Sequence, residues 1–276
     1  MPELPEVETV RRVLQPQLVG LTVQKARILY PPLMPLHRAQ CAEGQQIAGM
    51  GRRGKYLQIL FSSGDRLILH LRMTGCLLKV SPEQPQDKHT SAEFLLSDGS
   101  LLRFIDQRRF GRIWFIAQGE AEPEGMQSLG PEPQDVDEAL LREKFGTSRR
   151  AIKTLLLDQT RIAGIGNIYS DEILFACGIH PNTSAAVLDE EAWRRLAEKI
   201  PQTMAYYVEK NAISAADYLL GGGKDYRNTP YLNVYGRRGA PCRNCGTPLE
   251  RSVIGGRGSI WCPNCQKEPK GAANHG

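Results

Sequence analysis

Long hydrophobic runs are missing from this 276-residue sequence. No stretch approaches the roughly 18 uncharged apolar residues that a membrane-spanning helix needs, so we expect no membrane contact. The N-terminus has acidic residues and no apolar signal core, so we also expect no export signal. No repeat of solenoid period is present. The missing membrane span and export signal favour a protein of the cytoplasm, where stable disulfides are rare.

Charge is nearly balanced over most of the chain but not at its end. The totals of 35 Lys/Arg and 30 Asp/Glu give a net charge of +5. Segment 224–276 holds nine Lys/Arg and three Asp/Glu, a balance of +6, which leaves −1 for residues 1–223. A basic segment on a near-neutral body is typical of proteins with an anionic partner, and nucleic acid is the first candidate. A solvated basic surface would give the same totals.

The first half of the chain has the pattern of a β domain preceded by a helix. Pro5 suits a first helical position, and Val7, Val10, Leu14 and Leu18 recur at helical spacing, which indicates one buried face. Short strand-like runs follow without intervening helices and predict an antiparallel sandwich or barrel. These runs are 22–30, 55–61, 66–73, 92–96, 101–105 and 112–117.

The second half is predominantly helical. Segment 119–134 is rich in Pro, Gly and Glu, and we interpret it as an interdomain linker. Pro201 should kink or split the last helix. Three consecutive glycines within 219–230 predict a mobile loop. The predicted helices are 136–145, 150–159, 167–177 and 189–211.

The residues after Met1 have unusual chemistry for a terminus. Because Pro2 is small, we expect Met1 to be removed, which leaves a secondary amine at the N-terminus. An α-amino group has a pKa of about 7.7–8.0 in model peptides, so part of it is uncharged and nucleophilic at neutral pH. An amine that attacks a carbonyl carbon forms a Schiff base, and the adjacent Glu3 could move a proton beside it. Taken alone, the stretch is more simply interpreted as a frayed end.

Two Cys-x-x-Cys pairs lie near the C-terminus, Cys242 with Cys245 and Cys262 with Cys265, and sixteen residues separate the pairs. This spacing is that of a four-thiolate zinc ribbon, in which a hairpin joins two tight turns. Four protein ligands leave no open coordination position, so we expect one structural Zn²⁺. Two disulfides are the alternative, and a reducing compartment disfavours them.

Several further motifs could contact a phosphate or enter a base stack. Residues 163–167 (AGIGN) precede a helix whose N-terminal amides could bind an anion. Arg257 lies between glycines at the tip of the predicted hairpin. Met73 and Phe110 follow strands in turn-like contexts beside arginines, as would suit an apolar wedge that fills the gap left by an extruded base. Core packing is an equal alternative for this pair.

Together these motifs resemble those of the bacterial formamidopyrimidine-DNA glycosylase family. The match runs from Pro2 to about Gln266, and its blocks are PELPEVETVRR, RRGKYL, HLRMTG, DQRRFG, LGPEP, AGIGNIYSDEILF, VYGRRG, PCRNCGTP and GRGSIWCPNC. The resemblance implies an α+β multidomain fold. It comprises a catalytic β-sandwich domain with a leading helix (1–134), a helix-two-turn-helix DNA-binding domain (135–230) and a zinc finger (231–276).

The resemblance also implies a bifunctional DNA glycosylase and AP lyase of base-excision repair. Such an enzyme removes 8-oxoguanine and formamidopyrimidines from double-stranded DNA and nicks the strand by β- and δ-elimination. One structural Zn²⁺, no small-molecule cofactor, a monomeric state and action on the bacterial nucleoid belong to the same expectation.

Carried over position by position, the resemblance implies Pro2 as the nucleophile at C1′, Glu3 as the acid/base group and Lys55 as the lysine that contacts phosphate and assists base release. The implied phosphate clamp is His70, Asn167, Tyr235 and Arg257. The residues implied to fill the void of the everted base are Met73, Arg108 and Phe110, with Arg108 facing the orphan cytosine. The residues implied near the damaged base are Glu6, Lys153 and Lys224. The assignment of Lys224 rests on counting back from VYG, because the loop GGGKDYRNTP departs from the family's form.

Two alternatives remain at the level of sequence. Endonuclease VIII-like enzymes act on oxidised pyrimidines and share the proline nucleophile, but the PELPE start and the Met73, Arg108 and Phe110 set favour the purine-lesion branch. A zinc-ribbon DNA-binding protein without activity is the second alternative, and the intact Pro2, Glu3 and Lys55 argue against it.

Overall fold

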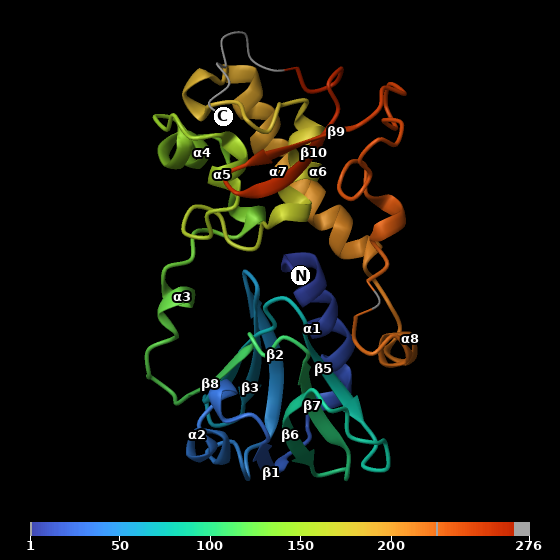
Figure 1. Cartoon of the computed structure of the whole chain (residues 1–276). Helices are drawn as coiled ribbons and strands as arrows, with labels where there is room; N and C mark the ends of the chain where they lie inside the picture. The colour runs from blue at the N-terminus through green and yellow to red at the C-terminus, as the bar shows by residue number, and fades with distance from the viewer. Residues whose placement is uncertain (1, 225, 268–276) are drawn as a thin grey trace. The chain divides into compact units, whose positions relative to one another are not determined.

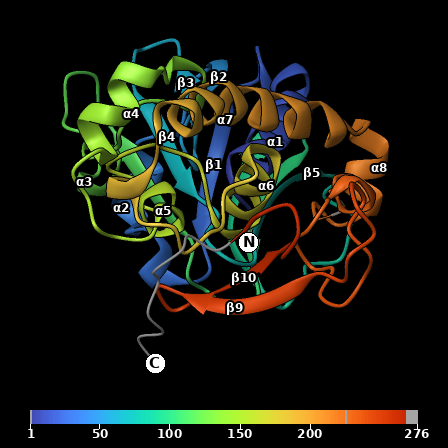
Figure 2. The same ribbon diagram turned by 90° about the horizontal axis from the view of Figure 1, so that it is seen from above.

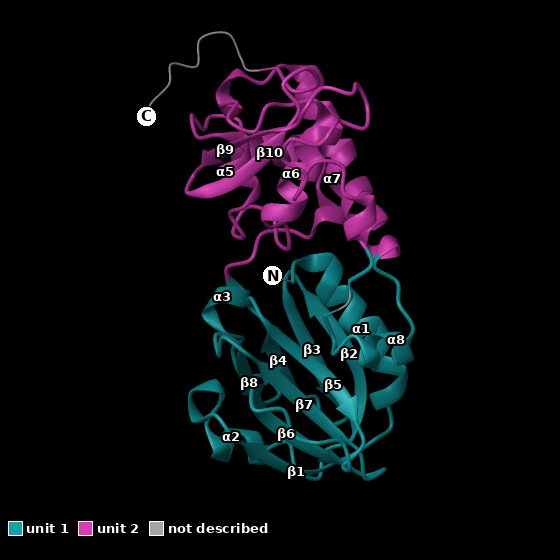
Figure 3. Ribbon diagram, turned by 45° about the vertical axis from the view of Figure 1, so that its right-hand side comes forward, with its two compact units in different colours: residues 1–127, 211–227 teal, residues 128–210, 228–276 magenta. Residues whose placement is uncertain are grey.

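The computed structural model describes residues 2–224 and 226–267, so Met1 and its expected removal lie outside the described residues. The chain forms two compact units, 1–127 with 211–227 and 128–210 with 228–276 (Figure 1, Figure 3). The division into three domains stays a prediction. Its boundaries assign residues 211–227 to the helical domain, whereas in the structure these residues belong to the first unit. No helix within the described ranges has the length and apolar character to cross a bilayer.

The first unit contains two antiparallel four-stranded sheets, with strand orders β1-β6-β7-β5 and β2-β3-β4-β8. The strands are β1 (Val23–Ile28), β2 (Ile47–Arg53), β3 (Tyr56–Phe61), β4 (Arg66–His70), β5 (Gly75–Val80), β6 (Thr90–Leu96), β7 (Leu101–Asp106) and β8 (Arg112–Ile116). All six predicted strands are present. The sequence analysis missed β2 and β5, because IAGMGRR and GCLLKV lack clear alternation and contain glycine.

One apolar core lies between the two sheets and extends under α1 (Leu4–Leu18). The helix packs against β2, β3 and β5, and its four periodic apolar residues are buried as predicted. Helix α8 (Ala215–Leu220) packs against α1 and β5, and the hydroxyl of Tyr218 donates to the carbonyl of Leu77 at 3.1 Å. The remaining elements of this unit are η1 (Pro31–Leu33), α2 (Leu36–Gln40) and α3 (Glu124–Gln127).

The second unit is helical and carries a two-stranded hairpin. Its elements are η2 (Pro133–Asp135), α4 (Glu138–Phe145), α5 (Ile152–Leu156), α6 (Asn167–Cys177), η3 (Ala185–Val187), α7 (Glu190–Lys210), η4 (Thr229–Tyr231), β9 (Glu250–Ile254) and β10 (Arg257–Trp261). Helix α7 is continuous through Pro201, so the predicted split is wrong (Figure 2). Its buried stripe continues on both sides of the proline, from Trp193 to Tyr207, and packing against α6 keeps the two halves in one helix.

Candidate active site and nucleic-acid interface

The start of the chain is packed into the first turn of α1. Glu3 is the N-cap and forms a capping box with Glu6, whose Oε2 accepts the backbone N–H of Glu3 at 2.8 Å. The other oxygen of Glu6 accepts Nδ2 of Asn211 at 3.0 Å. Pro2 is buried, and Glu3 and Glu6 are only 1% and 2% exposed. The frayed-end interpretation is therefore wrong, and the candidate nucleophile is held by the helix that follows it.

Lys55 and His70 lie at one end of the β2–β3–β4 sheet. Lys55 occupies the β2–β3 turn and is buried, and its neighbour Tyr56 pairs directly with His70. Nδ1 of His70 accepts the backbone N–H of Arg72 at 3.0 Å. Burial, with the positive charges of Arg72 and Lys55, lowers the pKa of His70 to about 3. The imidazole is therefore neutral near pH 7 and carries its proton on Nε2, where it can act as a hydrogen-bond donor.

The candidate wedge residues project from two turns of the first unit. Met73 and Phe110 are 42% and 49% exposed, so core packing does not explain them. The guanidinium carbon of Arg108 lies 4.8 Å from the centre of the Phe110 ring, a cation–π distance. Arg72 and Arg109 adopt left-handed backbone conformations with φ of 54° and 56°. Such strain in non-glycine residues is typical of functional turns.

Asp106 braces both turns, and the sequence analysis did not identify it. Its carboxylate is 1% exposed. Oδ1 accepts the hydroxyl of Thr74 at 2.5 Å and the backbone N–H of Arg108 at 3.2 Å, and Oδ2 accepts the N–H of Gly111 at 2.7 Å. The available signal was the aspartate at the end of a strand and the start of a turn, where this side chain commonly binds backbone amides.

Lys224 is exposed beside a cavity of about 440 Å³ within the first unit. The cavity is lined by strands β5 and β7, residues 84–87 and the glycine segment before Lys224, and neither Pro2 nor Lys55 lines it. A Cβ on Gly223 would lie 2.8 Å from Cδ2 of Leu78, so this glycine allows the segment to approach β5 closely.

Lys153 and Asn167 both bind the backbone carbonyl of Gly258 in the second unit. Asn167 is the first residue of α6 and follows Gly166, the N-cap. Its Nδ2 donates to the carbonyl of Gly258 at 3.0 Å. Lys153 in α5 is fully buried, and its ammonium donates to Oδ1 of Asp171 at 2.6 Å and to the same Gly258 carbonyl at 3.1 Å. The lysine expected near the damaged base is thus enclosed within this unit.

Tyr235 is positioned by Glu172, a second residue that the sequence analysis missed. The buried carboxylate of Glu172 accepts the backbone N–H groups of Asn233, Val234 and Tyr235, with a distance of 2.9 Å for each. It also accepts the hydroxyl of Tyr207 at 2.7 Å. The signal was two adjacent acids in an otherwise apolar stretch of helix, since buried carboxylates occur where several donors converge.

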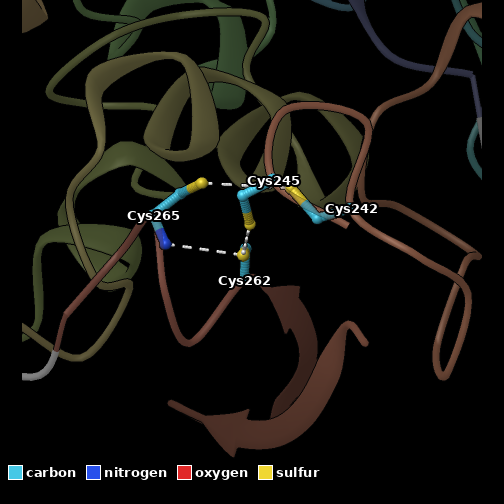
Figure 4. A group of neighbouring side chains, drawn as sticks. All are labelled: Cys242, Cys245, Cys262 and Cys265. Atoms are coloured by element: carbon cyan, nitrogen blue, oxygen red, sulfur yellow. Dashed lines mark hydrogen bonds between the residues drawn. The ribbon is translucent and has the colours of Figure 1, made fainter. Parts of the chain in front are cut away.

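The four cysteines of the C-terminal module converge as the spacing predicts (Figure 4). Their Sγ atoms lie within 4.8 Å of one another, with 3.9 Å between Cys242 and Cys265 and 3.4 Å between Cys245 and Cys262. A tetrahedral ion with Zn–S bonds of about 2.3 Å needs sulfurs roughly 3.8 Å apart. The residues therefore fit a single structural Zn²⁺. Hairpin β9–β10 joins the two cysteine pairs, and its second strand, β10, begins at the exposed Arg257.

The predicted site residues thus fall into two groups, and each unit contains one of them. The first unit holds Pro2, Glu3, Lys55, His70, Met73, Arg108, Phe110 and Lys224. The second holds Lys153, Asn167, Tyr235, Arg257 and the four cysteines.

Three family models match successive parts of the chain. They are the formamidopyrimidine-DNA glycosylase N-terminal domain over residues 1–113, the formamidopyrimidine-DNA glycosylase H2TH domain over 129–218 and the zinc finger found in FPG and IleRS over 239–267.

Relatives and solved structures agree with these matches. The chain is 42% identical to the formamidopyrimidine-DNA glycosylase of Geobacillus kaustophilus, over 97% of this chain and 100% of that protein. It is 41% identical to the protein of that name from Heliobacterium modesticaldum, with the same coverage. Fpg from Lactococcus lactis, in complex with DNA that contains an abasic site, superposes with a TM-score of 0.89 at 35% identity, covering 97% of this chain and 100% of that one. The chain belongs to the formamidopyrimidine-DNA glycosylase family.

Proposed function

We propose that this protein is a bifunctional DNA glycosylase and AP lyase of base-excision repair that removes 8-oxoguanine and formamidopyrimidines from duplex DNA. The packed start of α1 carries the proposal, because Pro2 and Glu3 are buried there and Glu6 binds the backbone N–H of Glu3. Complexes of Lactococcus lactis Fpg with abasic-site DNA and with FAPY-dG DNA support the substrate class. We place the reaction on the chromosome in the bacterial cytoplasm and expect a monomer.

Binding to DNA would use phosphate contacts from both units and a wedge from one. His70 offers a neutral N–H donor, and Asn167, Tyr235 and Arg257 offer donors on the second unit. Phosphate contacts position the duplex without reading its sequence. Extruding a base costs a few kcal/mol, less for a damaged one. The exposed Met73 and Phe110, with Arg108 stacked on Phe110, would occupy the space that the base leaves.

The chemistry begins when the nitrogen of Pro2 attacks C1′ and the bond from C1′ to the base breaks. The base departs with the bonding electrons and takes a proton, for which Glu3 and Lys55 are the candidate donors. Opening of the sugar gives an iminium at C1′. Loss of a C2′ proton then breaks the C3′–O bond, a second elimination breaks the C5′–O bond, and hydrolysis releases Pro2. The four cysteines would hold a structural Zn²⁺, which would stabilise the hairpin that carries Arg257 and take no part in the reaction.

Borohydride trapping on a duplex with 8-oxoguanine opposite cytosine tests the nucleophile. Intact mass should first show that Met1 is absent, because an uncleaved Met1 converts the nitrogen of Pro2 into a tertiary amide. We expect a covalent adduct with the wild type and a strongly diminished one with Pro2→Gly, whose N-terminus is a primary instead of a secondary amine. Pro5→Ala is the matched control, since Pro5 lies in the first turn of α1 without carrying the amine. Absence of the adduct in Met1-free protein, or an undiminished adduct with Pro2→Gly, would refute the proposal.

Oxidised pyrimidines are the second candidate substrate class. One Lactococcus lactis Fpg complex that superposes with a TM-score of 0.88 contains oxidised-pyrimidine DNA. Cleavage rates on 8-oxoguanine opposite cytosine and on thymine glycol separate the two classes. We expect faster cleavage of the purine lesion, and a strong preference for thymine glycol would assign the chain to the pyrimidine class instead.

A further inference from the structure

We propose that the buried pair Lys153–Asp171 positions the phosphate-contacting tip of hairpin β9–β10, and that Lys153 does not itself contact DNA. The inference rests on the proposed function, because it takes Arg257 and Asn167 as DNA-contacting residues. Lys153 and Asp171 would then be positioning residues that act on DNA through these two side chains.

Asp171 connects α6 directly to strand β10. Its Oδ1 accepts the ammonium of Lys153 at 2.6 Å and the hydroxyl of Ser259 at 2.6 Å. Its Oδ2 accepts the backbone N–H of Ile260 at 3.0 Å. The side chains of Lys153 and Asp171 are 0% and 1% exposed. The carboxylate therefore binds two successive residues of β10 from the buried interior of the unit.

The backbone carbonyl of Gly258 in the hairpin accepts hydrogen bonds from residues of both α5 and α6. It accepts the ammonium of Lys153 at 3.1 Å and Nδ2 of Asn167 at 3.0 Å. Gly258 follows Arg257 directly, so fixing this carbonyl restricts the backbone that carries the arginine side chain. The same contact orients the Asn167 amide, and one buried ammonium thus acts on both candidate phosphate contacts.

The turn of the hairpin contacts α5 as well. Gly255 has a φ of +56°, and a Cβ placed on it would lie 2.5 Å from Cγ2 of Thr154. Thr154 is the neighbour of Lys153 on α5. The hairpin tip therefore contacts α5 at its turn through Thr154 and just beyond Arg257 through Lys153. The four residues of the tip, 255–258, are therefore held by two contacts: the close approach of Gly255 to Thr154 and the hydrogen bond from Lys153 to Gly258.

Charge explains why a lysine suits this position. An ammonium has three donors, so one group can bind the Asp171 carboxylate and the Gly258 carbonyl at once. Removing it leaves a carboxylate in a dry interior without its counter-charge, which is strongly unfavourable. The carboxylate would then draw in water or a proton, and the strand bound to it would lose its fixed position.

A double-mutant cycle on DNA affinity tests the proposal. The variants are Lys153→Met, Arg257→Ala and their combination, and the ligand is a duplex with a stable abasic-site analogue. We expect Lys153→Met to weaken binding about tenfold alone and by a clearly smaller factor in the Arg257→Ala background, where only the route through Asn167 remains, because residues of one network are not additive. The same loss in both backgrounds would overturn the proposal, since it would indicate an independent contact with DNA.

A double variant in which both members of the Lys153–Asp171 pair are uncharged provides a second test. It remains informative if Lys153→Met alone folds poorly. Adding Asp171→Asn to Lys153→Met removes the unpaired charge. The amide oxygen can still accept the backbone N–H of Ile260, and the amide N–H can donate to the hydroxyl oxygen of Ser259. We expect this pair to recover part of the lost affinity, and no recovery would contradict the proposal. Lys199→Met is the control, since Lys199 is a partly exposed lysine on α7. Zinc content and melting temperature report general structural damage, which would lower stability without coupling to Arg257.

The outcome is distinguishable from failure of the proposed function. If Arg257→Ala binds the duplex as tightly as the wild type, the tip makes no phosphate contact and the positioning proposal is overturned. Borohydride trapping through Pro2 still reports the glycosylase activity in that case.

Discussion

The backbone N–H of Glu3 donates to Oε2 of Glu6 at 2.8 Å, so the residue next to Pro2 is held by the first turn of its own helix. We predict that Glu6→Ala lowers stability by about 1 kcal/mol, the usual value of a helix cap, and slows formation of the borohydride adduct more than it weakens DNA binding. Single-turnover trapping and unfolding curves measure the two effects. Arg12→Ala, whose side chain is 52% exposed on the same helix, is the control. Trapping by Glu6→Ala at the wild-type rate would show that the cap does not position the amine.

Phe110 is 49% exposed, so its side chain is accessible to DNA. We predict that Phe110→Ala changes the free energy of unfolding by less than about 0.5 kcal/mol, as is usual for an exposed residue. Removal of 8-oxoguanine from a fully paired duplex should nevertheless slow about tenfold, with a smaller effect when the lesion is mispaired and less costly to extrude. Leu36→Ala, at a 50% exposed position, should alter neither quantity. An equal slowing on both duplexes would argue against a wedge.

His70 should make stability depend on pH. Burial, with the charges of Arg72 and Lys55, lowers the pKa of His70 from 6.5 to about 3, so the folded state binds fewer protons than the unfolded state between these values. Stability from this group is complete above about pH 6.5 and is lost as the pH falls toward 3. We predict that the wild type loses more stability than His70→Gln between pH 7 and 4, measured by urea unfolding. His37→Gln, at an exposed histidine, should follow the wild type, and identical slopes for His70→Gln would refute the assignment.

Removal of Zn²⁺ should weaken DNA binding through hairpin β9–β10. Cys242 and Cys262 lie with Phe175, Val234 and Leu249 in a small apolar cluster, and Cys265 packs against it. Loss of the ion should therefore loosen the segment that presents Arg257. We predict release of one Zn²⁺ per chain to a strong chelator, a loss of DNA affinity of at least about tenfold and recovery when Zn²⁺ is restored. Cys245→Ser should reproduce the loss and Cys41→Ser should not, since Cys41 is outside the cysteine cluster. Unchanged affinity in the metal-free protein would contradict this role.

Local pattern predicted most of the elements but not their full extent. The spacing of Val7, Val10 and Leu14 placed α1 correctly, because a buried helical face repeats every three to four residues. Strand β2 escaped prediction because glycines interrupt its alternation, although pairing with β3 and packing against α1 stabilise it. Pro201 was expected to kink or split α7, but the helix is not split, because its apolar stripe packs against α6 on both sides of the proline.

The sequence by itself determined the features that depend on short spacing: the cysteine pairs, the proline–glutamate start and the buried apolar face of α1. Tertiary structure alone decided which distant groups meet. Glu6 binds Asn211, 205 residues away, and Asp171 binds Ser259, 88 residues away. It also decided that Phe110 is exposed and that Lys153 is enclosed. A periodic pattern specifies which face of an element is buried, whereas the partner that neutralises a buried charge is set by the packing of the whole chain.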